Sequence, residues 1–163
     1  MRKTSIAKRL PTISLLALIM SGLAVAADNP FAGTWKIDDS KSSWSDGRFP
    51  KNMSLTIDLN FNGNEIKYHS VNDTAKGKPP AVIDYVATMD GKSYPLPNSA
   101  RFNQVSIRRL SDDQMEILEL KDGDVIVGAI WEVLPGGKRL VRRGIGKSPE
   151  GKSHAYEEFF ARQ

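Results

Sequence analysis

Short stretches in which apolar and polar residues alternate occupy most of the chain beyond its N-terminal segment. In the segment 55–61, for example, Leu55, Ile57, Leu59 and Phe61 are separated by single polar residues. Because successive side chains of a strand point to opposite faces, this pattern predicts a strand with one apolar face. Comparable patterns predict further strands in the segments 65–71, 81–90, 105–110, 114–120, 125–134 and 139–145.

Turn-forming residues separate these segments at short intervals. Asn62-Gly63, Asp90-Gly91 and Asp122-Gly123 are pairs typical of tight hairpins. Such short connections predict that consecutive strands are antiparallel neighbours. The strand after Asp90-Gly91 should be short, because Pro95 and Pro97 cannot donate hydrogen bonds to a central ladder.

About nine or ten strands follow from this reading, and no segment after the N-terminal one has a convincing helical period. The segment 153–160 fits either a short helix or a closing strand, and the strand is favoured. A long meander of strands must protect its two edges, and closure into a barrel does so. We therefore predict an all-β fold: a single antiparallel up-and-down β-barrel of about 8–10 strands, formed by residues 28–163.

Residues 1–27 have the features of a signal peptide. Four basic residues precede the apolar run 13–20, and Ala24-Val25-Ala26 matches the small-x-small pattern of a cleavage site. The run is shorter than the roughly 20 residues that a membrane span needs. We expect cleavage after Ala26 or Ala27, a periplasmic or secreted mature protein, and no transmembrane segment after cleavage.

Cleavage would change the charge of the protein. The formal net charge of +4 belongs to the precursor, whose first 27 residues hold four of the 23 Lys and Arg and none of the 19 Asp and Glu. The mature chain keeps 19 basic and 19 acidic residues, so no overall positive field indicates a nucleic-acid partner. The absence of Cys excludes disulfides, thiolate metal sites and Cys nucleophiles, and with two His we expect neither metal nor cofactor.

Gly33-Thr34-Trp35 opens the first strand after the signal peptide. Gly-x-Trp at this place in an up-and-down barrel resembles the lipocalin signature. The segments 35–44 and 90–95 resemble those of small exported bacterial lipocalin-like (calycin-type) proteins. The resemblance covers about residues 30–163, although no equivalent of the other short lipocalin motifs is found. It implies a barrel that captures a small apolar molecule.

The same resemblance implies how one end of the barrel closes. Gly33 would let the strand bend, Trp35 would plug the end, and in lipocalins an Arg from a late strand stacks on this Trp. Arg142 and Arg143 are the candidates here, and alternation requires that one of them points inward. The sequence leaves open which one does, and whether it meets Trp35 or lies at the rim.

The inward faces of the predicted strands supply the candidate ligand-binding residues: Phe61, Tyr68, Tyr85, Ala87, Met89 and Trp131. These side chains would either fill the barrel, as in eight-stranded barrels, or line a cavity in a wider one. A hollow barrel would bind a small hydrophobic molecule. A filled one would be an interaction module of the cell envelope. The ligand and the oligomeric state stay open.

Catalytic chemistry has few candidates in this sequence. His154 and Tyr156 share a face and would be the acid–base pair of a small barrel isomerase or cyclase, but they also fit a surface His and a structural Tyr. We therefore assign no catalytic residue. The segment 146–153 matches the phosphate-binding loop pattern, yet only ten residues follow Ser153, so we expect a hairpin loop there.

Overall fold

The structure, a computed structural model, describes residues 29–97, 99–148 and 150–163. The predicted signal peptide, residues 1–27, lies outside these ranges. The strands are β1 (Gly33–Trp44), β2 (Leu55–Asn62), β3 (Glu65–Asn72), β4 (Ala81–Thr88), β5 (Asp90–Pro95), β6 (Gln104–Arg109), β7 (Gln114–Lys121), β8 (Asp124–Val133), β9 (Arg139–Lys147) and β10 (Ser153–Arg162). Within the described ranges, no helix is long and apolar enough to cross a membrane.

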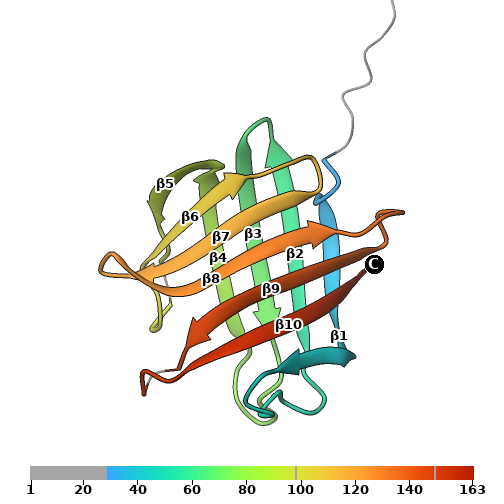
Figure 1. Cartoon of the computed structure of the whole chain (residues 1–163), viewed down its shortest axis with the longest axis vertical. Helices are drawn as coiled ribbons and strands as arrows, with labels where there is room; N and C mark the ends of the chain where they lie inside the picture. The colour runs from blue at the N-terminus through green and yellow to red at the C-terminus, as the bar shows by residue number, and fades with distance from the viewer. Residues whose placement is uncertain (1–28, 98, 149) are drawn as a thin grey trace, which may run out of the picture.

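All ten strands form one antiparallel sheet in the order β4-β3-β2-β1-β10-β9-β8-β7-β6-β5. The first and last strands are therefore neighbours, and the sheet curls into a nearly closed barrel (Figure 1). The predicted all-β up-and-down barrel is confirmed, and so is a strand at 153–160. The segment 146–153 is a β9–β10 hairpin, with Lys147 opposite Ser153.

Two similar dipeptides turn the chain differently. At Asp122-Gly123 both residues have positive φ, 53° and 91°, and the pair forms the predicted hairpin between β7 and β8. At Asp90-Gly91 only Gly91 has a positive φ, 78°, and the Asp90 carboxylate accepts a hydrogen bond from the Lys92 backbone N–H. The hairpin predicted there is wrong. The chain instead turns a corner, and within the described residues no ladder joins β4 to β5.

The barrel is packed at one end and open at the other, as the inward face of β4 shows. Ala81 is exposed and Ile83 is partly exposed, whereas Tyr85 and Ala87 are buried. We call the end where β1 begins the packed end, and the end where β1 finishes the open end. At the packed end the core includes fully buried Trp35, Ile57, Leu59, Ile66, Ile107 and Met115.

Trp35 closes the packed end. Its side chain is fully buried, and its indole N–H donates a hydrogen bond to the Phe31 carbonyl at 2.8 Å. The central carbon of the Arg162 guanidinium lies 4.1 Å from the Trp35 ring centroid. Arg162 also donates hydrogen bonds to the backbone carbonyls of Pro30, Ala32 and Gly137. A cation from a late strand thus meets the Trp, as the resemblance implied.

The identity of that cation corrects the sequence prediction, which named Arg142 or Arg143. Arg162 is directly opposite Trp35 in the β1–β10 register, whereas Arg142 and Arg143 lie on β9, one strand further away. Arg142 does point inward, but its guanidinium lies over Trp131, at 5.3 Å. Arg143 points outward and forms ion pairs with Glu132 and Glu157.

Gly33 has a second role beyond the predicted bend. Its φ is +120°, a conformation that L side chains rarely adopt. A Cβ atom at this position would lie 2.9 Å from Nη1 of Arg162. The glycine of the Gly-x-Trp motif therefore makes room for the arginine that covers the tryptophan.

Candidate ligand cavity

A cavity of about 280 Å³ occupies the open end of the barrel. Residues from eight strands, β1–β4 and β7–β10, and from the loops before β2 and β6 line it: Trp44, Met53, Leu55, Tyr68, Ser70, Asn72, Ala81, Ile83, Arg101, Phe102, Glu119, Val127, Arg142, Gly146, His154, Tyr156 and Glu158. Its volume is close to the lower limit of small-molecule sites. A compact ligand would fit there.

Small residues at inward positions explain why the open end is hollow. On β9, Leu140 is fully buried at the packed end, whereas Gly146 stands at the cavity and contributes no side chain. On β3, Ile66 fills the packed end and Ser70 lines the cavity. The same strands therefore provide both the core and the empty space.

A buried ion pair crosses the inner part of the cavity. Arg142 donates from Nε to Oε2 of Glu158 at 2.8 Å, with a second bond from its Nη2 to the same oxygen. The Trp44 indole N–H donates to the other Glu158 oxygen at 2.9 Å. The Glu158 side chain is only 3% exposed, so this charge needs these partners.

Aromatic rings surround the arginine of this pair. The rings of Trp131, Tyr156 and Phe160 have centroids 5.3, 5.6 and 5.5 Å from its guanidinium carbon. Burial opposes the Arg142 charge, but Glu158 and the nearby tyrosines more than offset it, so the pKa of Arg142 is raised. Arg142 is therefore a permanent cation that already has a carboxylate partner.

Glu119 is a carboxyl group inside the barrel that sequence reasoning missed. It shares the inward face of β7 with Met115 and Ile117 and stands opposite Val105 of β6 and Val127 of β8. Among the described residues it has no ion-pair or hydrogen-bond partner. Burial raises the pKa of Glu119, which its arginine neighbours oppose. The available signal was a lone acidic residue on an otherwise apolar inward face.

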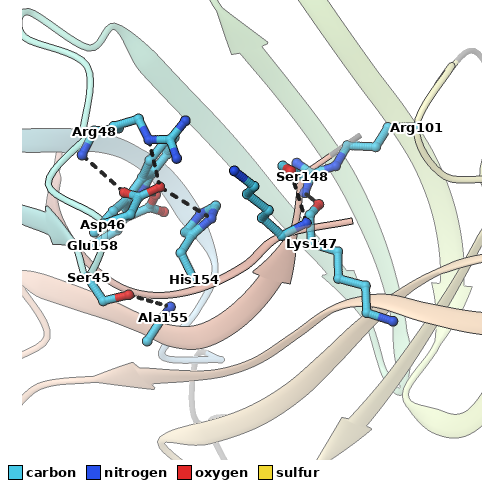
Figure 2. A network of polar contacts seen from close by, with 11 residues as sticks. Ser45, Asp46, Arg48, Arg101, Lys147, Ser148, His154, Ala155 and Glu158 are labelled. Atoms are coloured by element: carbon cyan, nitrogen blue, oxygen red, sulfur yellow. Dashed lines mark hydrogen bonds and ion pairs between the residues drawn. The ribbon is translucent and has the colours of Figure 1, made fainter. Parts of the chain in front are cut away.

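Polar contacts connect the end of β1, the β9–β10 region and the loop before β6 at the open end of the barrel (Figure 2). The His154 ring stacks on Trp44 with a centroid distance of 4.8 Å, and its Nδ1 lies 4.0 Å from a carboxylate oxygen of Asp46. Arg101 donates a hydrogen bond to the Lys147 carbonyl and so ties the loop before β6 to the end of β9. The mouth is therefore framed by residues distant in sequence.

The cavity walls differ from those predicted. Of the six candidate ligand-binding residues, Tyr68 lines the cavity. The others, Phe61, Tyr85, Ala87, Met89 and Trp131, do not, and the wall assignment was wrong for them. They belong to the packed core or pack against it, because ring stacking fills this part of the barrel: Tyr68 and Tyr85 stack at 4.5 Å.

The structure brings the weak catalytic candidates together, since His154 and Tyr156 both line the cavity. Burial raises the pKa of Tyr156 to about 12, so its hydroxyl stays protonated at neutral pH and can donate a hydrogen bond. Burial has the same effect on the pKa of Tyr68, also raised to about 12. No group of three or more His, Asp or Glu in the described ranges is arranged to hold a metal ion.

Comparison with solved structures identifies the fold. The Schistosoma mansoni fatty acid binding protein in complex with arachidonic acid has 11% identity and a TM-score of 0.56, over 82% of this chain and 96% of that one. The zebrafish ileal bile acid-binding protein complexed with cholic acid has 12% identity and a TM-score of 0.54, over 82% and 99%. The apo form of Caenorhabditis elegans lipid binding protein 8 has 9% identity and a TM-score of 0.52, over 86% and 100%.

These likenesses show the fold alone: an antiparallel up-and-down barrel similar to those of the fatty acid and bile acid binding proteins named here. No family model matches the chain. No curated protein matches it either.

Proposed function

We propose that the protein binds one small amphipathic molecule in the cavity at the open end of its barrel. The cavity itself carries this proposal: it is concave, mixes apolar walls with a few convergent polar groups, and lies inside the barrel. Solved neighbours of this fold are described as binding arachidonic acid and cholic acid, which supports the same use of the barrel interior here.

The proposal includes export. Residues 1–27 have the order of charge, apolar run and small residues that directs secretion, so the mature protein would act in the periplasm or outside the cell. A binding protein in that compartment would meet its ligand before the ligand reaches the cytoplasm.

One observation favours a second candidate, a small barrel isomerase or cyclase. Glu119 and Tyr156 both face the cavity, and they are close enough that the Glu119 charge contributes to the raised pKa of Tyr156. A carboxyl and a tyrosine hydroxyl that line one cavity are group types that serve in acid–base catalysis. Simple binding uses the same two groups without a chemical step and is therefore our first choice.

A neutral fluorescent probe such as Nile red tests binding in the purified protein. The probe should bind saturably at one site with a rise in emission. Ala81→Trp would fill the mouth of the cavity and should weaken binding by about tenfold. Val82→Trp is the matched control, because Val82 is the next residue of β4 and is 42% exposed on the outer face.

Equal binding by the wild type and both variants would place the probe outside the cavity and contradict the proposal. So would the absence of saturable binding in the wild type. A bound molecule that leaves the protein chemically altered would instead favour the enzyme.

A further inference from the structure

We propose that the cavity selects a ligand whose head group donates hydrogen bonds, a hydroxyl or an ammonium group, and discriminates against a carboxylate. This inference rests on the proposed binding function and names the ligand class for that same cavity. It is carried by the arrangement of Glu119, Arg142 and Glu158.

The positive charge of the inner arginine, Arg142, is already matched by the carboxylate of Glu158. Its Nε and Nη2 both donate hydrogen bonds to the same oxygen of Glu158, and the Arg142 side chain is only 17% exposed. A ligand carboxylate would either share the single positive charge of Arg142 with Glu158, through the remaining guanidinium N–H groups, or displace Glu158. Displacement would leave the buried Glu158 charge with the Trp44 N–H alone, which is costly.

Glu119, in contrast, is available to a ligand. It lines the cavity and has no hydrogen-bond or ion-pair partner in the described part of the chain. A carboxylate accepts hydrogen bonds at both oxygens, so a hydroxyl or an ammonium group at this place would satisfy it. A second carboxylate would meet it as a like charge.

The distribution of charged residues around the cavity also favours a hydrogen-bond-donating head group. Glu158 lies beside Arg142, its direct partner in the β9–β10 register, and Glu119 lines the same cavity from β7, while Arg101 lies at the mouth, over the ring of Phe102 at 4.9 Å. With Arg142 and Glu158 cancelling each other, the inner cavity keeps the acidic character of Glu119. The cationic or hydrogen-bond-donating end of a ligand would therefore lie inside, against β7.

Glu119 can bind a hydrogen-bond-donating head group of a ligand in either of its protonation states. Burial raises its pKa, with a smaller contribution from Glu158 and opposition from Arg142 and Arg101. An ionised Glu119 would favour an ammonium group. A protonated Glu119 would both donate to and accept from a hydroxyl, whereas a ligand carboxylate, which only accepts, would leave the Glu119 carbonyl oxygen without a donor.

Three ligands with one chain length separate these cases: octanol, octylamine and octanoate, each used to displace Nile red at pH 7. We expect octanol or octylamine to displace the probe at concentrations about tenfold lower than octanoate. The order of the displacing concentrations of octanol and octylamine shows whether the site prefers a hydroxyl or an ammonium group. Octanoate binding as tightly as both would overturn the inference.

Glu119→Gln tests whether this residue is responsible. The variant should reduce the preference over octanoate by about tenfold and keep Nile red binding, which also reports an intact cavity. Glu116→Gln is the matched control, since Glu116 lies on the same strand but faces outward and pairs with Arg108.

An unchanged preference in Glu119→Gln would also overturn the inference. If that variant fails to fold, the ranking of the three ligands by the wild type decides alone. Failure of Nile red to bind the wild type would contradict the proposed function itself, and is thus a different outcome.

Discussion

Arg162, the penultimate residue of the chain, lies over the indole of Trp35, the third residue of the first strand, at 4.1 Å. The two are direct partners in the β1–β10 register. This contact joins the first and the last strand of the chain at the packed end of the barrel. The arginine also holds the backbone on both sides of the closure through its three carbonyl partners.

Removal of this arginine should destabilise the barrel. Arg162→Ala loses the cation–π contact and leaves three carbonyls without a donor, and should cost about 2–3 kcal/mol of unfolding free energy. Urea denaturation measures this loss. Arg139→Ala is the control, because Arg139 is an exposed residue of β9, and it should change stability by less than about 0.5 kcal/mol. Equal effects of the two variants would contradict this role.

Removal of the tryptophan should cost more. Trp35→Ala deletes a fully buried indole and should lower the unfolding free energy by about 3–5 kcal/mol, again by urea denaturation. A loss below about 0.5 kcal/mol would mean that Trp35 is not a buried plug.

Gly33→Ala should be destabilising for two reasons that add. The φ of +120° is strained for alanine, and the new methyl group would meet Arg162 at 2.9 Å. We expect a loss of about 1–3 kcal/mol in urea denaturation. Gly63→Ala, at a positive φ with open space around it, isolates the backbone contribution and should cost less. A larger loss in Gly63→Ala would contradict the steric role of Arg162.

Ala87→Trp distinguishes a filled interior from a hollow one. Ala87 is 2% exposed within the packed core, so the added indole should overpack it and cost about 1–3 kcal/mol in thermal or urea unfolding. Ala81→Trp, six residues earlier on the same inward face, stands at the open end and should cost much less. Similar losses in both variants would mean that the barrel is equally filled at both ends.

Glu119 should make the ligand-free protein less stable as the pH rises. Its pKa is raised in the folded state, so the folded protein holds this proton above the ordinary value of 4.5 at which the unfolded chain releases it. Its stabilising contribution is full below that value and is lost as the pH rises through the folded pKa. Glu119→Gln should therefore be more stable than the wild type at pH 7, in urea titrations without ligand.

That advantage of Glu119→Gln should disappear below pH 4.5, where the wild-type carboxyl is protonated in both states. Glu116→Gln, on the outer face, provides the comparison. A difference between Glu119→Gln and the wild type that does not change with pH would contradict the burial of this carboxyl.

Periodicity alone predicted the strands well, because a half-buried strand imposes alternation on its own sequence. Periodicity could not identify residues whose role depends on partners that are distant in the sequence. Arg162 meets Trp35 only because β1 and β10 are neighbours, and a local pattern does not specify the register of strands so far apart. The Asp90-Gly91 corner was misread since the dipeptide is compatible with both a hairpin and a bulge.

The cavity shows the same limit. The sequence analysis missed Glu119, although its inward position could have been read from the alternation of β7. Its lack of a partner could not, because it depends on Arg142 having Glu158 as a partner from the next strand. Which end of the barrel is hollow follows from several strands together, through small residues such as Ser70 and Gly146. No single segment contains that information.

The corner at Asp90-Gly91 leaves β4 and β5 as the two edges of the sheet. The barrel wall is therefore open along this seam: every other junction between described strands has a hydrogen-bonded ladder, whereas β4 and β5 are joined only by the chain through Met89 and have no ladder between them. Widening the seam breaks no backbone hydrogen bond, so it is the cheapest way for the wall to expand. A ligand longer than the resting cavity could be admitted by spreading β4 from β5 while the closure of Trp35 by Arg162, on the opposite side of the ring, stays intact.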